Sequence, residues 1–131
     1  METIMLTGKS GKGKTAVLFF VHEILVAAGA VLNKVEHVGA KNQRDFKSSL
    51  TYQGKKIVLL TMGDEEPDIE NALNDKNSDF LICACNDDHN KFFQQATHRF
   101  EKTTADSLSS RIAANWYDAN RIVEQLEKSI S

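Results

Sequence analysis

The segment GKSGKGKT, residues 8–15, has the residue types and spacing that bind phosphate. Glycines let backbone N–H groups approach an anion closely, and they adopt backbone conformations that side chains disfavour. Lys14 would supply a full positive charge to phosphate oxygens, and the Thr15 hydroxyl would ligate Mg²⁺. A helix that begins directly after the segment would aim its unpaired N–H groups at the same anion. The segment therefore predicts a phosphate site, although a basic surface loop could have the same composition.

The same segment satisfies the pattern G-x-x-x-x-G-K-[ST] and lies between two apolar stretches. It resembles the Walker A loop of the P-loop NTPases. The resemblance implies that the ligand is ATP or another nucleoside triphosphate, that the cofactor is Mg²⁺, that Lys14 is catalytic and that Thr15 binds the metal. The nucleotide-binding residues that it implies are Gly8, Lys9, Ser10, Gly11, Lys12, Gly13, Lys14 and Thr15.

In that superfamily a second motif, Walker B, ends a buried strand with an acidic residue that holds Mg²⁺. The candidate here is IVLLTMGD, residues 57–64, where Thr61 takes the usual acidic position and Asp64 follows later. The resemblance implies that Asp64 is catalytic and binds the metal, alone or together with Thr61. Gly63 would offer its backbone N–H to the γ-phosphate. The acidic residues that follow fit either a helix start or a catalytic role: Glu65, Glu66 and Asp68.

Other polar groups fall where a site of this kind would need them. Ligands of open α/β sheets bind at the carboxyl ends of strands, and one apolar run is followed there by Asn86, Asp87 and Asp88. Small P-loop kinases carry a basic lid after such a strand, and the corresponding residues are Lys91, His98, Arg99 and Lys102. Arg99 is the predicted catalytic clamp, because a guanidinium matches phosphate geometry. An anionic acceptor would be held by Lys41, Arg44 and Lys47.

The kind of P-loop protein stays open between three alternatives. Lys9 stands where the partition and septum-positioning ATPases carry an extra lysine, although Ser10 replaces a glycine of that family; this resemblance implies a homodimeric ATPase. A small kinase would transfer phosphate to an acceptor. A slow or non-catalytic nucleotide switch would act through a protein partner. The absence of the guanine-reading motif N/TKxD favours ATP.

Strands and helices must alternate to position these residues. Continuous apolar runs predict three buried, adjacent central strands at residues 3–6, 57–60 and 79–85. Residues 15–28 predict a buried helix that ends at Gly29. The pattern as a whole predicts an α/β fold, a three-layer sandwich with a mostly parallel central sheet of about five strands and helices on both faces.

The remaining segments complete this prediction. Residues 30–38 predict a half-buried strand, and residues 50–61 predict a hairpin that turns around Gly54. Short helices are expected at residues 68–73 and around 90–98. Residues 105–130 predict a long amphipathic helix, whose apolar face carries Leu108, Ile112, Trp116, Ala119, Val123, Leu126 and Ile130.

The composition limits the classes of partner. With 131 residues, 41% hydrophobic and 26% charged, the chain is expected to form a single domain, residues 1–131. A net charge of −2 gives no general attraction to nucleic acid or acidic membranes. The apolar run 16–28 is too short and too interrupted to span a bilayer, so a cytoplasmic location without a membrane partner is expected. Cys83 and Cys85 are predicted to be ordinary buried thiols.

Overall fold

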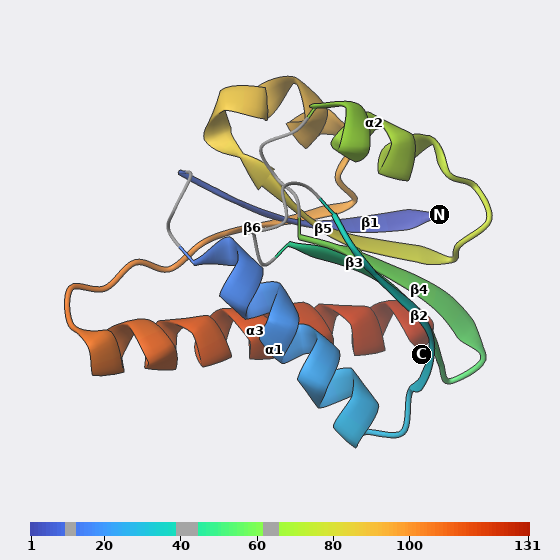
Figure 1. Ribbon diagram of the computed structural model, residues 1–131, viewed down its shortest axis with the longest axis horizontal. Helices are drawn as coiled ribbons and strands as arrows, with labels where there is room; N and C mark the ends of the chain where they lie inside the picture. The colour runs from blue at the N-terminus through green and yellow to red at the C-terminus, as the bar shows by residue number, and fades with distance from the viewer. Residues whose placement is uncertain (10–12, 39–44, 62–65) are drawn as a thin grey trace.

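The computed structural model describes residues 1–9, 13–38, 45–61 and 66–131. The strands in these ranges are β1 (Glu2–Gly8), β2 (Val31–His37), β3 (Phe46–Tyr52), β4 (Lys55–Leu60), β5 (Phe80–Asn86) and β6 (His98–Glu101). The helices are α1 (Lys14–Ala27), α2 (Glu66–Asn74), the 3₁₀ helix η1 (Asp87–Gln95) and α3 (Leu108–Ile130). These strands form one sheet in the order β2-β3-β4-β5-β1-β6 (Figure 1).

The three apolar runs form adjacent central strands, as predicted. β5 lies between β1 and β4 and is parallel to both. All seven residues of β5 are buried, and so are residues 3–7 of β1. The register places Gly8, the last residue of β1, beside Asn86, the last residue of β5. The carboxyl ends of these two strands therefore meet at the start of the glycine-rich loop.

The prediction of a mostly parallel sheet is wrong, because the sheet formed by these six strands is mixed. β3 is antiparallel to both β4 and β2. Gln53 and Gly54 both have positive φ, 50° and 76°, which is the two-residue turn that folds a tight hairpin. The expected hairpin is thus confirmed, and it reverses β3 relative to β4. Residues 38–45 are too few for the crossover that would make β2 parallel to β3.

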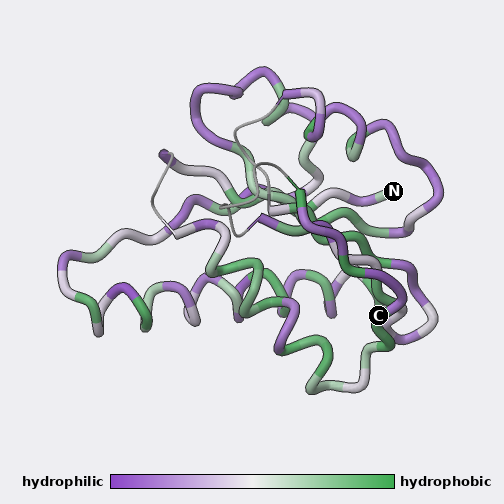
Figure 2. The backbone as a smooth tube through the Cα atoms, in the orientation of Figure 1, coloured by the Kyte–Doolittle hydropathy of each residue, from purple (hydrophilic) through white to green (hydrophobic). Residues whose placement is uncertain are grey.

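Helices cover both faces of the sheet, as predicted (Figure 1). On one face α1 and α3 pack over a core that includes Leu6, Leu18 and Leu126. On the other face α2 and η1 cover a second core that includes Met5, Ile69 and Phe92. Figure 2 shows that α1 is largely hydrophobic, whereas the α2 and η1 layer is largely hydrophilic.

Three element predictions need correction. Every residue of β2 is exposed instead of half-buried, because β2 is an edge strand and neither core cluster of the described residues includes it. Residues 90–98 do not form one helix: η1 ends at Gln95 and β6 begins at His98. The chain leaves the helix because residues 97–101 pair with the edge of β1. Thr97 N donates a hydrogen bond to Thr3 O at 2.8 Å, and β6 then continues the pairing with β1.

The third correction concerns the first half of α3. Leu108, Ile112 and Trp116 are exposed, whereas the predicted apolar face would have buried them. The first turns of α3 extend past the strands (Figure 1), so the sheet does not cover them. The buried residues of α3 are Ala114, Asp118, Ala119, Ile122, Val123 and Leu126.

Two further expectations concern the membrane and the thiols. None of the helices in the described ranges is both long enough and apolar enough to cross a bilayer. Cys83 and Cys85 are both buried free thiols, as predicted. Burial raises the pKa of Cys85 to about 11 and raises that of Cys83 still further, so both stay protonated at neutral pH.

Candidate functional site

The glycine-rich loop connects a buried parallel strand directly to the amino end of a helix. Gly13, the residue before α1, has φ 90°, a left-handed conformation that favours glycine. A Cβ atom at Gly13 would also lie 3.3 Å from Asn115 Oδ1. No described side chain caps the amino end of α1. The first N–H groups of α1 lie at this end of the helix, where they carry the positive end of the helix dipole.

Lys14 holds its charge on the inner side of this loop. The residue is buried, and its Nζ donates hydrogen bonds to Gly8 O at 3.2 Å and Lys9 O at 2.6 Å. Burying an ammonium group is costly unless such partners satisfy it. The loop carbonyls thus keep the charge beside the amino end of α1.

Asp45 joins Thr15 to the strand of the expected Walker B motif. The Thr15 hydroxyl donates to Asp45 Oδ1 at 3.0 Å, and the Thr61 hydroxyl donates to the same oxygen at 2.9 Å. Thr61 Oγ1 in turn accepts a hydrogen bond from Phe46 N at 2.8 Å. A hydroxyl and a carboxylate in contact beside Lys14 are oxygen ligands of the kind that Mg²⁺ binds together with substrate phosphates.

Sequence analysis did not identify Asp45. The residues predicted from this part of the sequence were the basic ones, Lys41, Arg44 and Lys47. Asp45 immediately precedes β3, whose partner β4 ends beside Thr61. The signal that could have identified Asp45 is an acidic residue directly before a strand. This signal is visible only when β3 is known to begin at Phe46.

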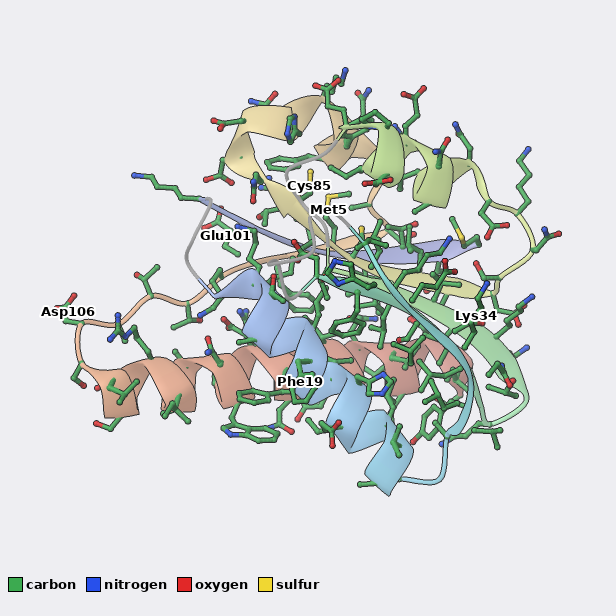
Figure 3. The ribbon with its side chains drawn as sticks, in the orientation of Figure 1. Met5, Phe19, Lys34, Cys85, Glu101 and Asp106 are labelled. Carbon is green, nitrogen blue, oxygen red and sulfur yellow. The ribbon has the colours of Figure 1, made fainter. Side chains whose placement is uncertain are left out.

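A pocket of about 780 Å³ lies beside the loop. Its walls come from the end of β1, the loop, the start of η1, the β6–α3 connection and α3. The lining residues are Thr7, Gly8, Lys9, Gly13, Asp87, Glu101, Lys102, Thr103, Thr104, Ala105, Asp106, Arg111 and Asn115. Figure 3 shows Glu101 and Asp106 at this end of the molecule. The pocket has the size of a small-molecule site, about 300–1,000 Å³, and polar groups surround it.

A buried charge network fixes the wall formed by the β6–α3 connection. Asp118 is 0% exposed and accepts hydrogen bonds from Thr103 N and Thr103 Oγ1, both at 2.7 Å. Arg121 Nη2 donates to Asp118 at 2.6 Å, and Lys102 Nζ lies 3.4 Å from it. Burial alone would raise the pKa of Asp118, but the hydrogen bonds from Thr103 and Arg121 and the charge of Lys102 hold it below its usual value.

Three of the four expected lid residues, Lys91, His98 and Arg99, are not among the pocket-lining residues, whereas Lys102 lies against the loop. The Arg99 guanidinium lies 4.6 Å from the centre of the Phe93 ring, and Arg99 is not among the pocket-lining residues. Lys91 pairs with Glu66 on the surface at 2.8 Å. Lys102 both lines the pocket and belongs to the buried network, and α3 contributes a second cation, Arg111, to the pocket lining.

The polar residues at the end of β5 and the start of η1 include one buried residue and two exposed ones. Asn86 is buried beside Gly8. Asp87 lines the pocket, while Asp88 is exposed on η1. Glu66 and Asp68 form the acidic first turn of α2, in agreement with a helix start. The residues of the prediction that lie outside the described ranges are Ser10, Gly11, Lys12, Lys41, Arg44, Gly63, Asp64 and Glu65.

No family model, curated protein or solved structure matches this chain. The described residues also contain no cluster of three or more His, Cys, Asp and Glu side chains that could hold a metal ion. A Mg²⁺ ion bound with a nucleotide does not need such a cluster, because phosphates and waters supply most of its ligands. A function for this site therefore rests on the loop, Lys14 and the Thr15–Asp45 contact.

Proposed function

We propose that this chain is a P-loop protein that binds a Mg²⁺–nucleoside triphosphate, with ATP favoured, and that hydrolyses or transfers its γ-phosphate. The observation that carries the proposal is that Gly8 ends a buried parallel strand and that Gly13, in a left-handed conformation, directly precedes α1. Lys14 adds a buried cation at that point. A phosphate there would accept hydrogen bonds from the loop and from the first turn of α1.

The metal would be held by the Thr15 hydroxyl and by Asp45, directly or through water. These two groups already lie 3.0 Å apart, and Mg²⁺ at nucleotide sites commonly takes one or two protein oxygens. When bound, the metal would neutralise charge on the phosphate oxygens. Thr61 supports this pair because its hydroxyl keeps the Asp45 carboxylate turned toward Thr15.

The pocket beside the loop would hold the rest of the nucleotide. Asn115 and Thr104 present polar groups suited to a base or a sugar, and Arg111 provides a cation for a phosphate.

A thermal-shift series with Mg²⁺ and ATP, GTP, CTP, UTP or inorganic phosphate tests the proposal. A ligand that binds only the folded state raises the melting temperature, so ATP should raise it. If none of the five ligands raises it, the proposal fails.

Replacing Asp45 by asparagine should weaken Mg²⁺-dependent binding of ATP about tenfold, since a charged metal contact is lost. ATP binding in excess EDTA should stay unchanged. The measurement is a calorimetric titration with and without Mg²⁺. Asp106→Asn is the matched control, because it removes an equal charge from the pocket lining without contacting Thr15. Equal Mg²⁺ dependence in wild type and Asp45→Asn would contradict the assignment.

The expected role of Asp64 makes a separate prediction. Asp64→Asn should leave ATP affinity within a few-fold of wild type but lower phosphate release about tenfold, a barrier rise of about 1.4 kcal/mol. Such a result fits a carboxylate that reaches the metal through water. Normal phosphate release in the variant would leave Asp45 as the only carboxylate assigned to the metal.

A second candidate function is a nucleotide-dependent switch that acts through a protein partner. The observation that favours it is the position of Asp45, because one carboxylate links the amino end of α1 to the start of β3. Metal binding would compete for that carboxylate and so affect the start of β3. Saturable ATP binding without phosphate release, with or without an acceptor, would favour the switch over the enzyme.

A further inference from the structure

β2 exposes apolar side chains at an edge of the sheet that has no strand partner among the described residues. Val31 is 61% exposed and Val35 is 52% exposed. An unpaired edge of this kind can pair with a strand of another chain. β2 and β6 are the opposite edges of the sheet, and Figure 3 shows Lys34 of β2 far from Asp106 of the pocket. Pairing at β2 would thus leave the pocket open.

The hydrogen-bond pattern determines which residues of β2 turn their backbone toward the free edge. Val38 N donates to Asp45 O at 3.2 Å, so Val38 faces β3. Thr61 N donates to Phe46 O at 3.1 Å, so Phe46 faces β4 and not β2. Because the direction alternates along an antiparallel strand, Glu36 faces β3, whereas Val35 turns its N–H and C=O outward.

Two opposite charges flank Val35 symmetrically. Lys34 Nζ and Glu36 Oε1 lie 3.5 Å apart on an exposed face of β2. If a second copy paired antiparallel with Val35 opposite Val35, each Lys34 would stand opposite the other copy's Glu36. Two-fold pairing centred on Lys34 or on Glu36 would instead set like charges opposite one another, which is destabilising. Charge thus favours Val35 over its two neighbours as the centre, and its outward N–H and C=O groups can form the central hydrogen-bonded pair.

We propose that two copies of this chain associate through β2, antiparallel and related by a two-fold axis at Val35. The two central Val35 residues would exchange a pair of N–H···O=C hydrogen bonds, and the two sheets would become continuous. A second copy is the occupant because the charge pattern of β2 complements itself. The inference goes beyond the proposed nucleotide site and does not depend on it.

The other face of β2 adds apolar surface to this interface. Val35 is paired with Ser48, which contacts His22 of α1, so the Val35 side chain lies on the α1 face. Phe19 of α1 is 49% exposed and lies against Phe46 on the same face. The two copies would bring both Val35 side chains together beside this aromatic surface, which removes apolar area from water.

Charge exchange tests the register. Sedimentation velocity of the full chain from about 1 µM to about 1 mM covers the range of weak and moderate complexes. Wild type should show a concentration-dependent dimer. Lys34→Glu and Glu36→Lys should each weaken dimerisation about tenfold, since both cross-strand pairs become repulsive, and the double variant should recover it. Failure of the double variant to recover would overturn the register, and a wild type monomeric at every concentration would overturn the interface.

A backbone substitution tests the central hydrogen bonds. Val35→Pro removes an N–H that points away from β3, so the β2–β3 pairing should survive while dimerisation is lost. Val35→Thr keeps the N–H and the branched side chain and should still dimerise. Circular dichroism spectra and melting curves would verify folding, and the charge variants remain decisive if the proline variant is unfolded. A dimer that persists in Val35→Pro but is lost in Ile112→Ser, on the exposed part of α3, would contradict the proposal.

Discussion

Replacing Lys14 by alanine is expected to lower the affinity for Mg²⁺–ATP ten- to a hundredfold. The substitution removes a charge-assisted contact to phosphate, which contributes about 1.5–3 kcal/mol. Lys14 is buried and held by the carbonyls of Gly8 and Lys9, so its ammonium is already placed at the loop before a ligand arrives. A calorimetric titration of both proteins with Mg²⁺–ATP measures the difference.

Lys55→Ala is the matched control for this variant. It removes the same charge from the exposed start of β4, in the β3–β4 hairpin. If general electrostatic attraction caused the effect, both variants would bind ATP equally weakly. An unchanged titration curve for Lys14→Ala would show that the loop is not a phosphate site, and the proposed function would then fail with it.

Replacing Asp118 by asparagine should destabilise the fold by about 3–5 kcal/mol, because it leaves a buried cation without its partner. The Lys102 side chain is 3% exposed, and the new amide would present a donor to groups that are themselves donors. A loss of this size lowers the melting temperature by about 10 °C or more in a chain of this length. Urea denaturation and thermal melting measure it.

The same network predicts a dependence on pH. The pKa of Asp118 in the folded protein is below its ordinary value of 3.8, because hydrogen bonds and nearby cations outweigh the effect of burial, which would raise it. Its stabilisation is therefore fully present above about pH 4 and is lost as pH falls through the folded pKa. The difference in unfolding free energy between wild type and Asp118→Asn should be constant from about pH 5 to 8 and shrink below about pH 4.

Two variants separate the charge network from a general effect on α3. Glu124→Gln removes an exposed carboxylate of the same helix and should change stability little. Adding Lys102→Met to Asp118→Asn removes the unpaired buried cation and should restore part of the lost stability. If Asp118→Asn and Glu124→Gln were equally stable, Asp118 would not hold the wall of the pocket.

Much of the fold could be predicted because its signals are local. The run at residues 57–60 has no polar interior, which indicates a strand buried on both faces, and β4 is such a strand. Gly54 marked the hairpin turn. Strand neighbours were harder to predict, because apolar runs indicate burial but not the neighbouring strand. The antiparallel pairing of β2 with β3 and the pairing of β6 with β1 were therefore not expected.

The sequence by itself determined the prediction of a phosphate site at residues 8–15, since that prediction needs only glycines, a lysine and a threonine at fixed spacing along the chain. The tertiary structure alone decided which residues meet that loop. Asp45 reaches Thr15 across thirty positions, and Asp118 is fifteen positions from the Thr103 that it holds. Such contacts depend on which strands are neighbours and where each one ends. Strand pairing is a long-range property, and the local pattern of residues does not specify it.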